Sequence, residues 1–370
     1  MPLEAAPRSL DAAVTLGRSG LRVSPFCLGT MTFGEEWGLG VSAEESFRVL
    51  DAYLERGGNF LDTANIYNKG HSEAIIGDFF ADGPGAGRRD RVVIATKFMG
   101  NLHPGDPNGG GGGRKAVLAA CEESLRRLRT EYIDLYWAHF HDPHTPIDET
   151  MGALDALVRQ GKVRYVGLSD HPAWICVQAQ YESMLRGWAP LVAIQIEYSL
   201  LQRTVEADLM PMARALGFGV TPWSPLRGGV LTGKFTRASH PEPGTTRVTP
   251  ESRFLVESTY RILDELAAIS ADLGATIPQV ALRWVQQRPG VSSTIIGART
   301  VPQLLDNLGA LSLSLSPSQI ERLDELSKPA LPFPHEFLEL VRSAIHNGST
   351  INGVTPPPWP LSPKGDADRW

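Results

Sequence analysis

The sequence predicts an α/β protein built as a (β/α)8 TIM barrel, and three observations lead to this prediction. Eight short apolar runs alternate with amphipathic segments along the chain. Most intervals between the runs are about 25–40 residues, the length of one strand–helix–strand unit. The runs are apolar throughout, which is typical of parallel strands buried on both faces. An open doubly wound sheet normally carries G-x-G-x-x-G after its first strand, and the turn LGTMTFGEEWG lacks that spacing.

The expected strands are bounded by Gly, Asp or Pro, which end regular structure. They cover residues 24–30, 59–64, 91–97, 132–139, 163–169, 192–198, 217–223 and 292–298. The segment before them, residues 15–24, reads as an N-terminal β-hairpin, and we expect it to close the floor of the barrel.

Helix starts lie between the strands. Ser42-x-x-Glu45 is a capping box ahead of Phe47, Leu50 and Leu54, whose spacing is that of one helix face. Further starts follow the same logic at Thr145-Pro146, Thr276-x-x-Gln279 and Ser316-Pro317-x-Gln319. They predict extra helices before and after the last strand.

Two segments fall outside the repeating pattern. The run Gly109–Gly113 predicts a flexible loop, either a solvated spacer or a mobile lid. The C-terminal region is rich in proline and reads as an extended tail. We therefore expect residues 1–330 to form a single barrel domain and residues 331–370 to form a C-terminal extension.

Composition excludes several classes of function. The formal net charge is −6 without a cluster of Lys and Arg, which argues against nucleic acid or an anionic membrane as the partner. No stretch approaches the roughly 18 apolar residues of a membrane span, and the N-terminus lacks the apolar core of a secretory signal. Cys27, Cys121 and Cys176 fit neither a disulfide framework nor a zinc site. We expect a cytoplasmic protein with reduced thiols, with homo-oligomerisation left open.

Four titratable side chains are expected at successive strand ends. Asp62 ends the second strand, Tyr67 follows it, Lys97 ends the third strand and His139 ends the fourth. In a barrel these ends converge on one mouth. Each residue alone has an ordinary structural explanation, but buried titratable groups are costly unless they pair. A cation beside a phenol also favours proton donation near neutral pH, so the set predicts a general acid that protonates a developing alkoxide.

Six stretches resemble the aldo-keto reductase family, and most of all its aryl-alcohol dehydrogenase-like branch. They are GGNFLDTANIYNKGHSE (57–73), VVIATK (92–97), YIDLYWAH (132–139), GKVRYVGLSD (161–170), PWSPLRGGVLTGKF (222–235) and IIGARTVPQLLDN (295–307). The resemblance implies an NADPH-dependent oxidoreductase that reversibly interconverts aldehydes or ketones and alcohols. It makes Tyr67 the proton donor, tuned by Lys97 and Asp62, and His139 the residue that orients the carbonyl.

The resemblance also implies positions that bind NADP(H). Ser169, Asp170 and Gln195 match positions that hold the nicotinamide carboxamide, and Trp223 matches an aromatic residue stacked on the nicotinamide ring. The remaining implied positions are Thr30, Met31, Ser224, Pro225, Leu226, Gly228, Lys234, Gly297, Arg299, Thr300, Gln303 and Asn307. Position 170 is a departure, because many relatives carry Asn there and an ionised Asp accepts hydrogen bonds without donating.

The residues themselves support part of this cofactor prediction. Thr300-x-x-Gln303 opens a helix whose free N–H groups attract an anion, and Arg299 adds a cation suited to a 2′-phosphate. These features favour NADPH over NADH. The structural alternative is an ordinary capping box beside a surface arginine.

Two other functions remain open. A metal-dependent hydrolase could use His139, His141 and His144 with Asp142, although the later strand ends offer no further ligand cluster; we expect no metal. A non-catalytic or regulatory NADPH-binding barrel, like the potassium-channel β-subunits, is the second alternative.

The substrate is expected to be a small carbonyl or alcohol. Its pocket should include Trp37, Met99 and Phe140, and the tail around residues 333–337 is a further candidate. For each of them the structural alternative is packing beneath a loop.

Overall fold

The computed structural model describes residues 8–239, 241, 246–249 and 252–369. The chain divides into two compact units, one ending at Ser327 and the other beginning at Lys328. Within the described residues, no helix combines the length and apolar character needed to cross a bilayer.

Eight parallel strands form the sheet of the first unit, in the order β10-β3-β4-β5-β6-β7-β8-β9. They are β3 (Phe26–Gly29), β4 (Phe60–Asp62), β5 (Val93–Phe98), β6 (Ile133–Ala138), β7 (Val163–Ser169), β8 (Leu191–Glu197), β9 (Gly219–Trp223) and β10 (Thr294–Gly297). The sheet comes round on itself because Ser292 N donates to Val220 O at 2.9 Å and Val291 bridges to Val220. The predicted (β/α)8 barrel is confirmed.

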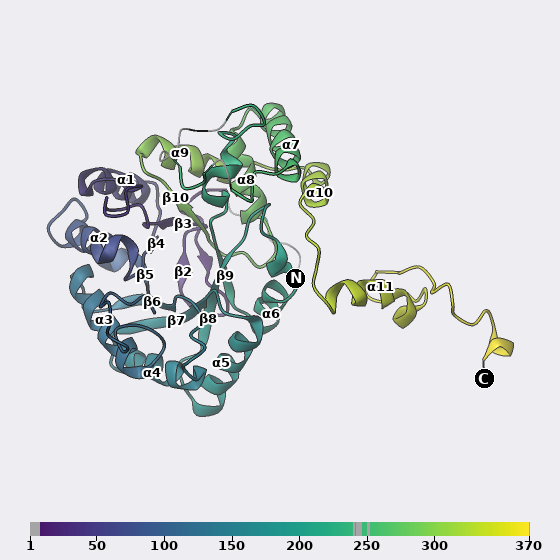
Figure 1. Ribbon diagram of the computed structural model, residues 1–370, viewed down its shortest axis with the longest axis horizontal. Helices are drawn as coiled ribbons and strands as arrows, with labels where there is room; N and C mark the ends of the chain where they lie inside the picture. Colours follow the sequence, from purple (N-terminus) through teal and green to yellow (C-terminus); the bar gives the residue numbers. More distant parts are fainter. Residues whose placement is uncertain (1–7, 240, 242–245, 250–251, 370) are drawn as a thin grey trace. The chain divides into compact units, whose positions relative to one another are not determined.

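Helices surround this sheet (Figure 1). They are α1 (Ala43–Glu55), α2 (His71–Ala81), α3 (Arg114–Leu128), α4 (Ile147–Arg159), α5 (Ala173–Arg186), α6 (Leu209–Leu216), α7 (Glu257–Leu273), α8 (Ile277–Gln286), α9 (Val301–Gly309) and α10 (Pro317–Leu326). Short 3₁₀ helices lie at η1 (Tyr67–Gly70), η2 (Arg89–Arg91), η3 (Thr204–Glu206), η4 (Arg227–Thr232) and η5 (Ala310–Ser312). The extra helices expected around the last strand are therefore present.

The predicted caps hold, with one change. Ser42 accepts from the backbone of Glu45, and the capping boxes that begin α8 and α10 are reciprocal. The hydroxyl of Thr145 instead donates to Asp142 at 2.7 Å, so Pro146 precedes α4 without a side-chain cap.

The N-terminal hairpin is also confirmed, and it fills the barrel floor. Strands β1 (Val14–Thr15) and β2 (Arg22–Val23) pair antiparallel. Leu16 and Val23 are fully buried and pack with Cys27, Phe60 and other side chains near the amino ends of the barrel strands. A Cβ at Gly17 would come within 2.5 Å of two backbone atoms of the barrel, so the hairpin approaches the barrel too closely for any larger residue.

The glycine run between β5 and α3 is a packed loop and not a free spacer. Gly111 N donates to Met99 O at 2.9 Å, and Gly112 N donates to Asp142 Oδ2 at 2.9 Å. The oxygen of Gly112 accepts from the hydroxyl of Thr150 at 2.8 Å. A Cβ on Gly112 would lie 2.7 Å from that hydroxyl. These glycines let two loops approach closely, a requirement that composition alone does not reveal.

The second unit contains α11 (His335–His346) and the short η6 (Asp366–Asp368). The sequence predicts an extended tail here, and the presence of α11 corrects this prediction. The prolines that flank this segment on both sides hid its helical periodicity.

Candidate active site

The candidate active site lies at the carboxyl ends of β4, β5 and β6, where three of the predicted residues form one hydrogen-bonded chain. The ammonium group of Lys97, which is fully buried, donates to Asp62 Oδ2, to Thr63 O at 2.9 Å and to the hydroxyl of Tyr67 at 3.1 Å. Lys97 therefore uses all three of its protons. Asp62 is also held from its other side, because Gln195 Nε2 donates to Oδ1 at 2.8 Å.

Tyr67 begins a turn that a neighbouring side chain anchors. Asn68 and Lys69 adopt left-handed φ values of 46° and 60°. The amide of Asn68 donates to Met31 O at 3.0 Å and to Phe33 O at 2.9 Å. These bonds hold the strained turn and with it the position of the phenol. Asn68 is not among the residues predicted from the sequence, although an Asn after the expected strand is a signal for a left-handed turn.

Burial and the charge of Lys97 shift the pKa of the phenol in opposite directions. Desolvation raises the pKa of Tyr67, Lys97 lowers it, and Asp62 raises it again, so that the pKa lies above its ordinary value. The sequence predicts that a nearby cation lowers this pKa. The effect of Lys97 has that sign, but burial outweighs it. Burial alone would lower the pKa of Lys97, but Asp62 raises it, and Lys97 stays protonated.

His139 lies beside this chain in its neutral form. Its ring meets the ring of Tyr67 edge-on, with centroids 5.9 Å apart. Burial, with a smaller contribution from the charge of Lys97, lowers the pKa of His139 to about 3. Its Nδ1 is buried without a hydrogen-bond partner in the described part of the chain. A neutral imidazole next to a phenol suits hydrogen bonding to a carbonyl oxygen.

The residues expected to line the substrate pocket divide into two groups. Trp37 lies edge-on to Tyr67 at 6.1 Å and Phe140 stacks on His139 at 4.9 Å, and both are more than 40% exposed. Met99 is 5% exposed and packs in the hydrophobic core beneath the glycine loop. Its position matches the structural alternative, packing under a loop.

Of the three positions matched to the carboxamide, Ser169 and Asp170 lie with Trp223, whereas the side chain of Gln195 bonds to Asp62. Trp223 Nε1 donates to Asp170 Oδ1 at 3.0 Å, and the hydroxyl of Ser169 donates to Oδ2 at 3.4 Å. Desolvation raises the pKa of Asp170 to about 6, although both hydrogen bonds oppose the rise. Asp170 thus accepts two hydrogen bonds, one of which holds the indole ring.

The segment after β9 forms a cradle of backbone in unusual conformations. Ser224, Gly228 and Gly229 have φ values of 52°, 62° and 98°. The hydroxyl of Ser224 accepts from Gly228 N at 3.2 Å. Pro225 is buried and Leu226 packs against the core, so these two residues support the cradle from below.

The positions matched to the adenosine end gather at the start of α9. Thr300 caps the helix through Gln303 N, while Gln303 Oε1 accepts from Arg299 N at 2.9 Å. Asn307 Nδ2 donates to Gly297 O at 3.1 Å. The alternative of an ordinary capping box is thus partly realised. Thr300 caps the helix as in such a box, but Gln303 bonds to Arg299, the residue before the cap.

Thr30 and Met31 form hydrogen bonds to the elements that carry Asp62 and Tyr67. The hydroxyl of Thr30 is fully buried and bonds to Asp62 O at 3.1 Å and to Ser72 Oγ at 3.0 Å. Met31 lends its backbone oxygen to the turn that carries Tyr67. Both residues therefore support the turn and the strand end that carry Tyr67 and Asp62.

Arg247 is a residue near Tyr67 that the sequence pattern does not predict. It lies in the long connection between β9 and β10, where no periodicity marks it. Desolvation lowers the pKa of its guanidinium, Tyr67 raises it and Arg299 lowers it further, so Arg247 is near both. Among the described residues, no carboxylate pairs with Arg247, Arg299 or Lys234. Cations that have no carboxylate partner in this part of the chain favour an anionic ligand.

The histidines considered for a metal site do not converge. His139 faces Tyr67, whereas the ring of His141 contacts His171 at 5.7 Å. Asp142 accepts from His144 N and from Thr145, so it organises its own loop. The described residues contain no cluster of three or more His, Cys, Asp or Glu arranged to hold a metal ion.

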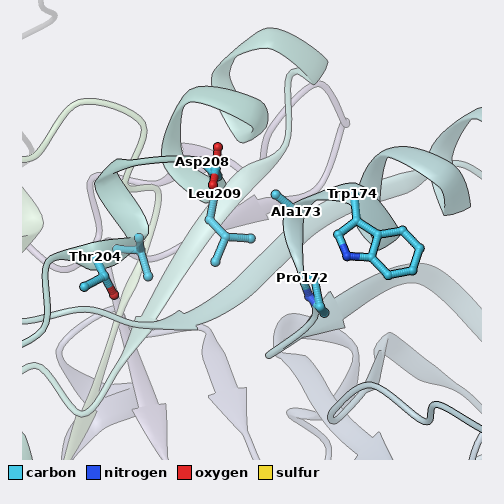
Figure 2. A pocket seen from close by; sticks show the side chains of 7 residues that line it. Pro172, Ala173, Trp174, Thr204, Asp208 and Leu209 are labelled. Atoms are coloured by element: carbon cyan, nitrogen blue, oxygen red, sulfur yellow. The ribbon is translucent and has the colours of Figure 1, made fainter. Parts of the chain in front are cut away.

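A hollow of about 430 Å³ opens beside the mouth, between the start of α5 and the start of α6. Figure 2 shows Trp174 on one side and Thr204, Asp208 and Leu209 on the other. Trp174 also meets His141 edge-on at 6.4 Å.

Residues 25–328 match the model of the Aldo/keto reductase family. The chain belongs to this family. The match spans all eight strands of the barrel and every residue of the Asp62–Lys97–Tyr67 chain, so this reductase is an oxidoreductase and is expected to use a nicotinamide cofactor.

Several known proteins are similar to the reductase over most of its length. An uncharacterised oxidoreductase, YrpG, of Bacillus subtilis is 41% identical over 320 residues, covering 84% of this chain and 94% of that protein. The aryl-alcohol dehydrogenase [NADP(+)] of Phanerodontia chrysosporium is 34% identical over 367 residues, covering 95% and 91%. Norsolorinic acid reductase of Aspergillus flavus is 34% identical over 330 residues, covering 86% and 82%. The predicted likeness to the aryl-alcohol dehydrogenase branch is confirmed, and neither the hydrolase nor the non-catalytic alternative is supported.

Proposed function

We propose that the reductase reduces aromatic aldehydes or ketones to alcohols with NADPH, with Tyr67 as the proton donor. The observation that carries this proposal is the contact of Lys97 Nζ with the Tyr67 hydroxyl beside a neutral His139. The aromatic substrate class rests on the exposed rings of Trp37 and Phe140 at the mouth and on the names of the relatives.

The side chains can divide the reaction between them. The chemistry expected of NADPH is hydride donation to the carbonyl carbon. Tyr67 then transfers its proton to the carbonyl oxygen, and the raised pKa keeps that proton in place before the reaction. The hydrogen bond from Lys97 stabilises the phenolate that remains, while Asp62 keeps Lys97 charged. His139 can bind the carbonyl oxygen as negative charge develops on it.

The residues of the cleft fit a dinucleotide with a 2′-phosphate. Lys234, Arg247 and Arg299 supply three cations, and Ser224 and Gly228 have left-handed backbone, a conformation found in loops whose N–H groups bind anions. Trp223, fixed by Asp170, offers a ring for stacking. We also place the protein in a reducing compartment such as the cytoplasm, since all three cysteines are buried and free.

Titration of the purified protein with NADPH and NADH, followed by intrinsic tryptophan fluorescence, tests the cofactor. Tight NADPH binding with quenching is expected, since Trp223 would lie against the nicotinamide. Oxidation of NADPH in the presence of aromatic aldehydes, followed by absorbance, tests the reaction. Binding of neither dinucleotide would contradict the proposal.

A further inference from the structure

The connection between β3 and α1, residues 30–41, is a loop whose two ends are bonded to each other. Gly34 N donates to Val41 O and Val41 N donates to Thr32 O, both at 2.9 Å. Trp37 lies between these ends along the chain. Because its ends are joined, the loop can hold the ring of Trp37 in one place only if something also fixes the loop to the barrel.

The side chain of Asn68 makes that attachment. Asn68 is 1% exposed, and its Nδ2 donates to Met31 O at 3.0 Å and to Phe33 O at 2.9 Å. Its Oδ1 accepts from Trp37 N at 3.1 Å. An Asn side chain has two N–H donors and one carbonyl acceptor, so both donors and the acceptor of this amide are bonded to the backbone of the loop.

The same residue follows Tyr67 directly in the chain. The rings of Trp37 and Tyr67 meet edge-on, with centroids 6.1 Å apart. The loop also packs closely on Asn68, because a Cβ on Gly34, whose φ is 101°, would lie 3.0 Å from the Cβ of Asn68. One buried side chain therefore fixes the distance between the exposed ring at the mouth and the candidate proton donor.

Two further links join the same segments of chain. His71 Nδ1 lies 2.5 Å from Glu36 Oε1, but both side chains are about one-third to one-half exposed, and exposed pairs contribute little. Ser72 Oγ donates to Thr30 O at 2.8 Å, at the start of the loop and away from Trp37. Asn68 is therefore the buried link that reaches the part of the loop that carries Trp37.

We propose that Asn68 is a positioning residue that couples the Trp37 ring to the Tyr67 hydroxyl and thereby sets the selectivity of the reductase for aromatic carbonyl substrates. The proposal rests on the proposed function. An aromatic substrate that contacts Trp37 presents its carbonyl to Tyr67 at a separation that Asn68 fixes. A short aliphatic aldehyde lacks the ring contact and depends on Tyr67 alone. A misplacement of about 1 Å can lower a rate by about 10²-fold.

The variant Asn68→Gly tests this role, because glycine adopts the left-handed conformation of Asn68 without strain. We expect kcat to fall by about 10–100-fold with both benzaldehyde and propanal, since Tyr67 loses its anchor. The ratio of kcat/KM for benzaldehyde to that for propanal should fall as well, by about 2–10-fold, the value of one aromatic contact. A merely structural role would lower both activities and leave the ratio unchanged.

Two control variants isolate the coupling. In a Trp37→Ala background, Asn68→Gly should no longer change the ratio, because no ring remains to be positioned. Ser72→Ala removes the bond at the start of the loop, so it should lower the melting temperature and keep the ratio. An unchanged ratio in Asn68→Gly, or an equal fall of the ratio with and without the Trp37 ring, would overturn the proposal.

Amide hydrogen exchange, read by mass spectrometry on the peptide that contains Trp37, tests the contact without turnover. The Trp37 N–H should exchange slowly in the native chain and faster in Asn68→Gly, but not in Ser72→Ala. Unchanged exchange in an active enzyme would contradict the role of Asn68 alone. A native chain that reduces neither aldehyde would contradict the proposed function and, with it, the role of Asn68 in selectivity.

Discussion

The hydroxyl oxygen of Tyr67 lies 3.1 Å from the ammonium nitrogen of Lys97, which also donates to Asp62. The distance fits a hydrogen bond in which Lys97 donates to the phenol oxygen. The phenol proton is therefore free to point toward a carbonyl oxygen. Lys97 thus donates to the phenol oxygen and Tyr67 donates to the substrate. Removing the Tyr67 hydroxyl should therefore affect proton transfer more selectively than any other change.

Replacing that hydroxyl should separate catalysis from binding. We expect Tyr67→Phe to lower kcat by about 10²–10⁴-fold, because general acid catalysis contributes that much. Cofactor affinity should stay within a few-fold of the native value, as measured by the fluorescence titration. Native turnover in this variant would contradict the role of Tyr67 as the proton donor.

Removing the counter-ion of Lys97 should cost stability as well as activity. In Asp62→Asn the buried ammonium group keeps no negative partner, and breaking such a pair costs about 3–5 kcal/mol of unfolding free energy. Urea unfolding measures this loss. The double variant Asp62→Asn/Lys97→Met is the control, and it should recover part of the stability but none of the turnover. Equal losses in the single and double variants would show that the pair is not coupled.

The two arginines of the cleft should affect the dinucleotides differently. Arg299→Ala should weaken NADPH far more than NADH, because only NADPH carries the 2′-phosphate that the guanidinium can bind. Arg247→Ala should weaken NADPH too, since Arg247 lies near Arg299 without a carboxylate partner in the described chain. Equal weakening of both cofactors by Arg299→Ala would rule out the 2′-phosphate role.

Two buried histidines should make the fold sensitive to acid. Burial lowers the pKa of His171 to about 4 and that of His139 to about 3, against about 6.5 for an unfolded histidine. Between the folded and unfolded pKa values, the unfolded chain binds more protons than the folded chain. The unfolding free energy is therefore highest above about pH 6.5 and falls as the pH drops toward 4. Each histidine contributes up to about 1.4 kcal/mol per pH unit.

Urea unfolding between pH 7 and pH 4 measures this dependence. His171→Asn should show a shallower fall than the native chain, because one of the two groups is gone. Parallel curves for the two proteins would contradict the assignment to His171.

The glycine loop offers a test of packing. Gly112→Ala should lower the unfolding free energy by about 1–3 kcal/mol, since the new methyl group would lie 2.7 Å from the hydroxyl of Thr150. Gly113→Ala is the matched control, because its Cβ would meet nothing closer than 3.7 Å. A thermal melt of both variants compares them, and equal melting temperatures would disprove the packing argument.

The barrel could be predicted from the sequence because each strand is a compact apolar run with a clear end, such as Asp62 for β4. The joint placement of Asp62, Tyr67, Lys97 and His139 followed from the convergence of strand ends. The proximity of Arg247 to Tyr67 could not be predicted, because a long loop has no period that fixes where its side chains lie. The net pKa of Tyr67 was beyond sequence reasoning too, because it depends on how much water the fold excludes.

The hairpin at residues 14–23 closes one end of the barrel, so that only the other end is open to ligands. Because Leu16 and Val23 fill the floor, reactants must enter and products must leave through the mouth that holds Tyr67 and Trp223. The molecule that binds deepest in this mouth is therefore expected to bind first and to leave last.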